Sequence, residues 1–103
     1  MERIEQLKKF LEANPTDSFL KHALALEYIK LGDDETARKV FEGLLADEPG
    51  YVGSYYHLGK LFERIGDNDK AIEWYQNGMQ VAKEKGEQHA FGELRGAWEE
   101  LTF

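Results

Sequence analysis

Two stretches of equal length share one pattern and decide the fold: LALEYIKLGDDETA at residues 24–37 and LGKLFERIGDNDKA at residues 58–71. They lie 34 residues apart, and leucine, glycine, aspartate and alanine recur at that offset. The only two prolines of the chain, Pro15 and Pro49, are separated by the same interval. A period of this size is typical of stacked copies of one structural unit, so the sequence predicts a repeat protein.

The ends of the helices follow from the same pattern. Apolar residues recur at helical spacing from the start of the chain, and the first helix is expected to end near Asn14, because the residue before a proline is disfavoured in a helix. Gly32 ends the next helix, and Asp33 caps the one that follows. The N-cap of the helix that ends at Gly32 is left undecided, because three adjacent residues all suit that position: Thr16, Asp17 and Ser18.

The second copy repeats this plan until its last helix. Residues 51–65 are expected to form its first helix, after which Gly66 breaks the chain and Asp67 caps the second helix. No proline follows at the expected place, so this helix is predicted to run on by a turn or less toward Gly86. A final helix from about Gln88 carries apolar residues on one face.

We therefore expect a single domain of 103 residues with four parts. No linker or low-complexity tract interrupts the chain, which argues against a second domain. The parts are an N-terminal helix at 1–14, a first repeat at 15–49, a second repeat at 50–86 and a capping helix at 87–103.

The matched positions resemble the tetratricopeptide repeat, whose pattern asks for a large residue, Leu-Gly, an aromatic, a small residue, an aromatic and a proline. The first copy supplies Lys21, Leu24, Ala25, Tyr28, Ala37, Phe41 and Pro49. The second supplies Tyr55, Leu58, Gly59, Phe62, Ala71 and Tyr75, and lacks only the proline. The small residues suit close helix crossings and the aromatics fill the space between helices, so these residues are expected in the core.

The resemblance implies an all-α fold, a right-handed α-solenoid of antiparallel helix pairs with two such motifs between single flanking helices, as in small stand-alone bacterial members of the family. It also implies a concave groove, lined by the first helix of each repeat, that holds a peptide or a partner's helix. Carried over by position, the groove residues are Phe19, His22, Leu26, Lys30, Tyr56, His57, Lys60 and Arg64. Tyr56 and Phe19 would serve as aromatic anchors, and the basic side chains as donors to carboxylates.

A second function remains open, in which the chain assembles with itself. The final helix carries four apolar residues that either seal the stack or bury against a second copy in a homodimer: Phe91, Leu94, Trp98 and Leu101. Gly92 and Gly96, four residues apart on the same helix, weaken it in isolation and would permit another helix to approach closely. The two hypotheses are thus an interaction adaptor working through its groove and a scaffold working through its end.

Composition excludes several other classes. The net charge of −7 argues against nonspecific binding to nucleic acid or anionic membranes. The three histidines lack the spacing of a metal site, apart from His89 with Glu93 four residues later, which a surface pair explains. No nucleophile with a base and no phosphate loop is present, so we expect neither an enzyme nor a cofactor. Without cysteine or an apolar leader, a cytoplasmic location is expected.

Overall fold

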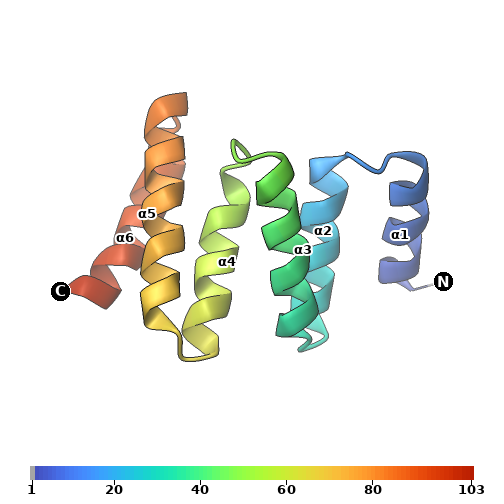
Figure 1. Cartoon of the computed structure of the whole chain (residues 1–103), viewed down its shortest axis with the longest axis horizontal. Helices are drawn as coiled ribbons and strands as arrows, with labels where there is room; N and C mark the ends of the chain where they lie inside the picture. Colours follow the sequence, from blue (N-terminus) through green and yellow to red (C-terminus); the bar gives the residue numbers. More distant parts are fainter. Residues whose placement is uncertain (1) are drawn as a thin grey trace. The chain divides into compact units, whose positions relative to one another are not determined.

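A computed structural model of the chain describes residues 2–103, which form helices and no strand. This confirms the all-α class. The chain divides into two compact units, Met1–Glu48 and Pro49–Phe103. Three helices belong to each unit, and they are drawn in Figure 1: α1 (Arg3–Ala13), α2 (Ser18–Lys30) and α3 (Asp34–Asp47), then α4 (Gly53–Arg64), α5 (Asn68–Lys85) and α6 (Gln88–Thr102).

Aspartates cap the helices as the pattern predicts. The side chain of Asp33 accepts a hydrogen bond from the amide of Thr36 at 3.1 Å, and that of Asp67 from the amide of Lys70 at the same distance. The N-cap of α2, which the sequence left undecided among three residues, is Asp17, because its carboxylate accepts a hydrogen bond from the amide of Leu20. These bonds satisfy amides that have no partner within their own helix, and so they fix where α2, α3 and α5 begin.

Glycines end the first helix of each repeat. Gly32 and Gly66 have φ angles of 79° and 84°, a left-handed conformation that side chains disfavour. The chain reverses at these points, so that α3 returns along α2 and α5 along α4 (Figure 1). α5 runs on to Lys85 as the missing proline predicts, whereas α4 begins at Gly53, two residues later than expected.

The first unit is held by one helix pair and a flanking helix. Ala25 of α2 and two residues of α3, Ala37 and Phe41, are fully buried. α1 packs against α2 through Leu7, which is 1% exposed. The ammonium group of Lys8 lies 5.9 Å from the ring centre of Tyr28, which adds a cation–π contact between the same two helices.

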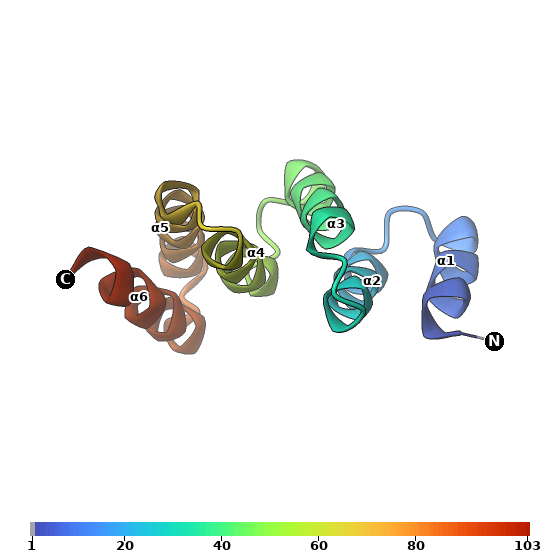
Figure 2. The same cartoon turned by 90° about the horizontal axis from the view of Figure 1, so that it is seen from below.

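In the second unit three helices pack together, since α6 lies against both α4 and α5 (Figure 2). The ring of Tyr75 on α5 covers the backbone of Gly59 on α4, and a Cβ atom at residue 59 would lie only 2.2 Å from that ring. At residue 78 of α5 a Cβ atom would lie 2.6 Å from the Cβ of Tyr55 and 3.0 Å from a methyl group of Leu94 on α6. Glycine at these two positions therefore permits the close approach of all three helices.

Two hydrogen bonds tie the segment before α4 to the second unit. The hydroxyl of Tyr55 donates to the carbonyl oxygen of Pro49 at 2.6 Å. The ammonium group of Lys85, in the last turn of α5, donates to the carbonyl oxygen of Gly50 at 2.8 Å. Side chains of both α4 and α5 thus fix the segment that leads into α4.

Among residues 2–103, no helix is both long enough and apolar enough to cross a bilayer.

Candidate functional site

The groove residues predicted on α2 are dispersed along a mixed surface. Phe19 is 66% exposed, and Lys30 is exposed with its ammonium group 2.9 Å from the carboxylate of Glu27. His22 and Leu26 are half-buried, and the His22 ring meets the ring of Phe41 edge-on at 5.5 Å. Phe19 therefore stands out as an exposed apolar side chain, while His22 contributes to packing against α3.

Two of the four predicted residues on α4, Tyr56 and Lys60, border a cavity in the second unit. The cavity has a volume of about 200 Å³ and lies between α4 and α6. We call this surface the α4–α6 cavity. It brings together residues that are distant in sequence: Tyr56 and Lys60 from α4, and Gly92, Glu93, Gly96, Ala97 and Glu100 from α6.

The α4 wall of the cavity is fixed by a chain of contacts. The ammonium group of Lys60 lies 5.4 Å from the ring centre of Tyr56 and 3.5 Å from the carboxylate of Glu63. That carboxylate accepts a hydrogen bond from the hydroxyl of Tyr75, whose side chain is fully buried in α5. Burial and this carboxylate raise the pKa of Tyr75 far above its usual value, so the hydroxyl stays protonated and keeps donating.

The α6 wall lacks side chains at its centre. Cβ atoms added at Gly92 or Gly96 would meet no atom within 4 Å, so the backbone there is open. Within the described residues these two glycines border the cavity, and the close approach of a helix from a second copy stays a prediction. Glycines four residues apart on one helix face were the signal that could have identified this wall, and the site prediction missed it.

The two remaining predicted residues on α4, His57 and Arg64, are not among the residues that line the cavity. His57 is half-buried next to the ring of Tyr56, and Arg64 is exposed near the end of α4. Burial lowers the pKa of His57, while the charge of Glu93 on α6 opposes that change and Arg64 adds to it. With Lys60 on α4 and two glutamates, Glu93 and Glu100, on α6, the cavity has one basic and one acidic wall.

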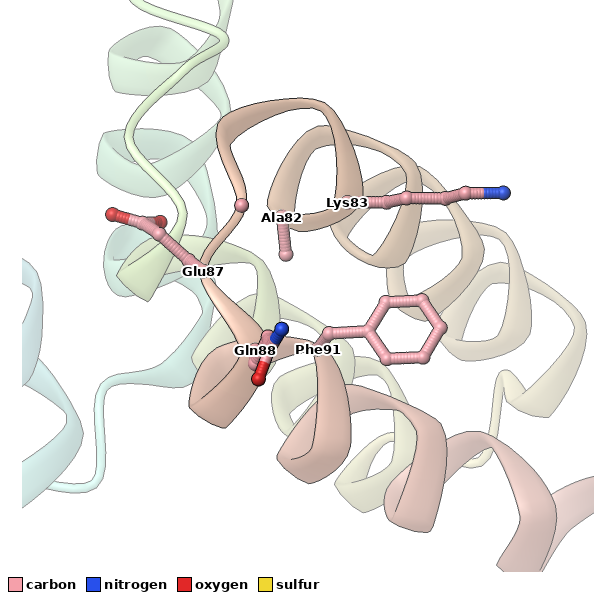
Figure 3. Close-up of a pocket in the computed structure, with 6 residues that line it drawn as sticks. Ala82, Lys83, Glu87, Gln88 and Phe91 are labelled. Carbon is pink, nitrogen blue, oxygen red and sulfur yellow. The ribbon is translucent and has the colours of Figure 1, made fainter.

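A second surface runs along the junction of α5 and α6. Two adjoining cavities of about 340 and 250 Å³ share Lys83 and Phe91. Figure 3 shows the first, where Phe91 and Lys83 extend to the same side and Glu87 points away from them. Trp98 lines the second, and its buried indole N–H has no hydrogen-bond partner among residues 2–103.

The four apolar residues predicted for self-association divide between this surface and the core. Phe91 and Trp98 are partly exposed on it, and Leu101 is half-buried. Leu94 is only 1% exposed, because it packs inward near Gly78 and Tyr55. Leu94 therefore belongs to the core of the second unit and is not available to a second copy.

Within residues 2–103, no group of three or more Asp, Glu, His or Cys side chains is placed so that it could hold a metal ion. His89 and Glu93 form the surface pair that their spacing suggests, with 3.7 Å between the imidazole Nε2 and the carboxylate. Both side chains are largely exposed to solvent.

Comparison with known proteins places this architecture in a family. Models described as tetratricopeptide repeat match residues 17–51 and 54–88, which together span more than half of the chain. The chain is 43% identical to a tetratricopeptide repeat domain protein from Salinibacter ruber, whose crystal structure it matches with a TM-score of 0.80 over 84% of this chain and 96% of that one.

Two further proteins are similar to this chain over most of its length. A TPR repeat-containing protein of Pseudomonas aeruginosa is 28% identical over 91 residues, which are 88% of this chain and 87% of the relative. A protein of Bordetella parapertussis shares the fold, with a TM-score of 0.85, 22% identity and coverage of 99% of this chain and 89% of that one. Other curated relatives are much longer, and this chain spans only 17% and 25% of two of them.

The caps, the glycine breaks and the small residues at the helix crossings all occupy the positions that the repeat pattern assigns to them. Tetratricopeptide repeats are in general modules for protein–protein interaction. On the sequence matches and the fold together, the chain belongs to the tetratricopeptide repeat family.

Proposed function

We propose that this protein is a non-catalytic interaction module whose second unit binds a peptide segment of a partner protein in the α4–α6 cavity. The observation that carries the proposal is the pairing of a rigid aromatic and basic wall, Tyr56 with Lys60, with an open backbone wall at Gly92 and Gly96. A preformed concave site with few, fixed polar groups is the usual form of a binding site.

The two walls suit different parts of a peptide. Tyr56 offers a flat apolar face that loses little conformational entropy on binding. Lys60 is held over that face and directs its charge toward an acidic group. The glycines of α6 let a peptide main chain lie close to the helix, and Glu93 and Glu100 beside them favour a basic residue there.

The test fills the cavity without disturbing the fold. Gly96→Leu places a side chain in the cavity, and Gly43→Leu places the same side chain on α3, where a Cβ atom also meets nothing within 4 Å. Both replacements remove a helix-weakening glycine, so both variants should be at least as stable as the wild type. Proteins captured from the native extract by the wild type and by Gly43→Leu, but lost with Gly96→Leu, would support the cavity.

A charge variant provides an independent arm of the same experiment. Tyr56→Ala combined with Lys60→Glu should lose the same captured proteins as Gly96→Leu does. If all of these variants capture identical sets of proteins, the cavity does not bind the partner and the proposal is wrong.

Self-association through α6 is the alternative, and one observation favours it. Phe91 and Trp98 line an apolar surface next to α5, and the indole N–H of Trp98 is buried without a partner among residues 2–103. A homodimer that covers this surface would have twice the protomer mass of 11.9 kDa. Sedimentation of the wild type and of Trp98→Ala separates the two functions, since a wild-type monomer argues against the dimer.

A further inference from the structure

The two walls of the α4–α6 cavity are unequal in charge. Among the described residues that line it, Lys60 alone is basic, and the carboxylate of Glu63 lies 3.5 Å from its ammonium group. The charge of Lys60 is thus balanced within α4. Glu93 and Glu100 on the α6 wall leave two negative charges for a ligand to meet, so the cavity attracts cations.

Neither carboxylate of the α6 wall has a lysine or arginine partner in the described part of the chain. Glu93 lies 3.7 Å from the imidazole of His89, at a site open to solvent. Burial lowers the pKa of His57 and raises that of Tyr75; the charge of Glu93 opposes the first change, and the charge of Glu100 adds to the second. Both carboxylates are therefore close enough to act across the cavity on residues of α4 and α5.

The spacing of these carboxylates sets the spacing of the cations that they can bind together. Glu93 and Glu100 are separated by two turns of α6, or ~10.5 Å along the helix axis. Gly96 lies between them, and a Cβ atom there would meet nothing within 4 Å, so a peptide main chain can cross the helix at this point. An extended segment advances about 3.3 Å per residue, and residues three positions apart therefore span a comparable distance.

Arginine is the basic residue that suits these walls best. Its guanidinium group donates two parallel hydrogen bonds to one carboxylate, which an ammonium group cannot do. The cavity of about 200 Å³ is smaller than the ~300–1,000 Å³ of small-molecule sites, so it suits side chains of a partner better than a whole small ligand. Lys60 on the facing wall repels a further cation between the two arginines.

The polar groups behind the α4 wall distinguish the second repeat from the first. Lys60, Glu63 and Tyr75 form a continuous chain of contacts. At the offset of 34, the first repeat has apolar residues at all three positions: Leu26, Ile29 and Phe41. The helix pair of the first unit forms without such polar groups, so packing of the repeat does not require them, and this favours a role in binding.

We propose that the α4–α6 cavity selects a partner segment with two arginines separated by two residues that are not basic. One arginine binds the carboxylate of Glu93 and the other that of Glu100, while the main chain between them crosses Gly96. This selectivity rests on the proposed function, to which it adds the chemistry and the spacing of the bound residues.

The test measures the binding of labelled synthetic peptides to the full chain by fluorescence anisotropy. The probe is a peptide of glycine, alanine and serine with two arginines three positions apart. One control peptide has the two arginines at its opposite ends, and another has glutamates in place of the arginines. The probe should bind more tightly than both, because a longer link between two binding groups lowers their effective concentration, and because glutamates meet like charges.

Variants of the protein locate the contact. Glu93→Gln and Glu100→Gln should each weaken binding of the probe about tenfold, the effect of losing one charge-assisted hydrogen bond. Glu84→Gln removes the same charge from an exposed position of α5 and should bind the probe as the wild type does. Gly96→Leu should abolish binding, because its side chain occupies the path of the main chain.

The proposal is overturned if the three peptides bind alike, or if all three glutamine variants bind the probe equally. It also fails if Gly96→Leu retains the binding, since the peptide then lies elsewhere. Any of these results leaves the proposed function standing as long as Gly96→Leu loses the proteins that the wild type captures from the extract. If that capture is unchanged, the proposed function and this selectivity fail together.

Discussion

The ring of Tyr75 lies directly on the backbone of Gly59, so the crossing of α4 and α5 has no room for a single additional methyl group. Gly59→Ala should therefore destabilise the protein by about 1–3 kcal/mol, the usual cost of overpacking, although alanine favours a helix more than glycine does. Urea denaturation followed by circular dichroism measures the change. Gly43→Ala is the control, because its new methyl group meets no atom within 4 Å, and it should be neutral or stabilising.

Removal of the carboxylate that holds the Tyr75 hydroxyl should also be costly. Glu63→Ala leaves a buried hydroxyl without its partner, which typically costs about 1–3 kcal/mol. Tyr75→Phe removes the other partner, and the double variant should be more stable than the sum of the two single changes predicts. Additive effects in this double-mutant cycle would mean that the hydrogen bond contributes nothing.

The cap of α5 makes a separate contribution. Asp67→Ala removes the acceptor for the amide of Lys70 and should lower stability by about 1 kcal/mol. Asp67→Asn keeps an acceptor oxygen at the same position and should retain most of the stability. Thermal denaturation of the three proteins compares them, and an equal loss in both variants would point to charge rather than capping.

His57 should make the second unit sensitive to acid. Burial lowers its pKa in the folded protein below the usual 6.5, so the unfolded chain binds the proton more readily. The stabilising effect is complete above that value and is lost as the pH falls through the folded pKa. NMR titration should find the His57 pKa below 6.5, and His57→Gln should flatten the fall in stability below pH 6.5. A His57 pKa at or above 6.5 would contradict the assignment.

The helices could be predicted well because the repeat supplies two copies of each signal. Asp33 and Asp67 cap, and Gly32 and Gly66 break, at the same offset, so each boundary is supported twice. The predicted start of α4 is two residues early, since apolar character begins at Tyr51 before the helix does. Local patterns identify an element more firmly than its first residue.

The cavity was only half predictable. Tyr56 and Lys60 follow from the repeat position, but their counterparts Gly92 and Gly96 become part of a site only when α6 packs beside α4. Leu94 was misplaced for a related reason, because helical spacing groups apolar residues on one face without indicating which neighbour covers each of them. Such information lies in contacts between helices distant in sequence, and no single-helix pattern contains it.

The two hydrogen bonds that reach back to Pro49 and Gly50 have a practical consequence for cutting the chain. A fragment that lacked residues 1–50 would leave the Tyr55 hydroxyl and the Lys85 ammonium group without the carbonyl oxygens that accept their hydrogen bonds. A fragment that starts at Pro49 keeps both acceptors and all three helices of the second unit. Residues 49–103 are therefore the better choice when the α4–α6 cavity is to be isolated for spectroscopy or grafted onto another protein.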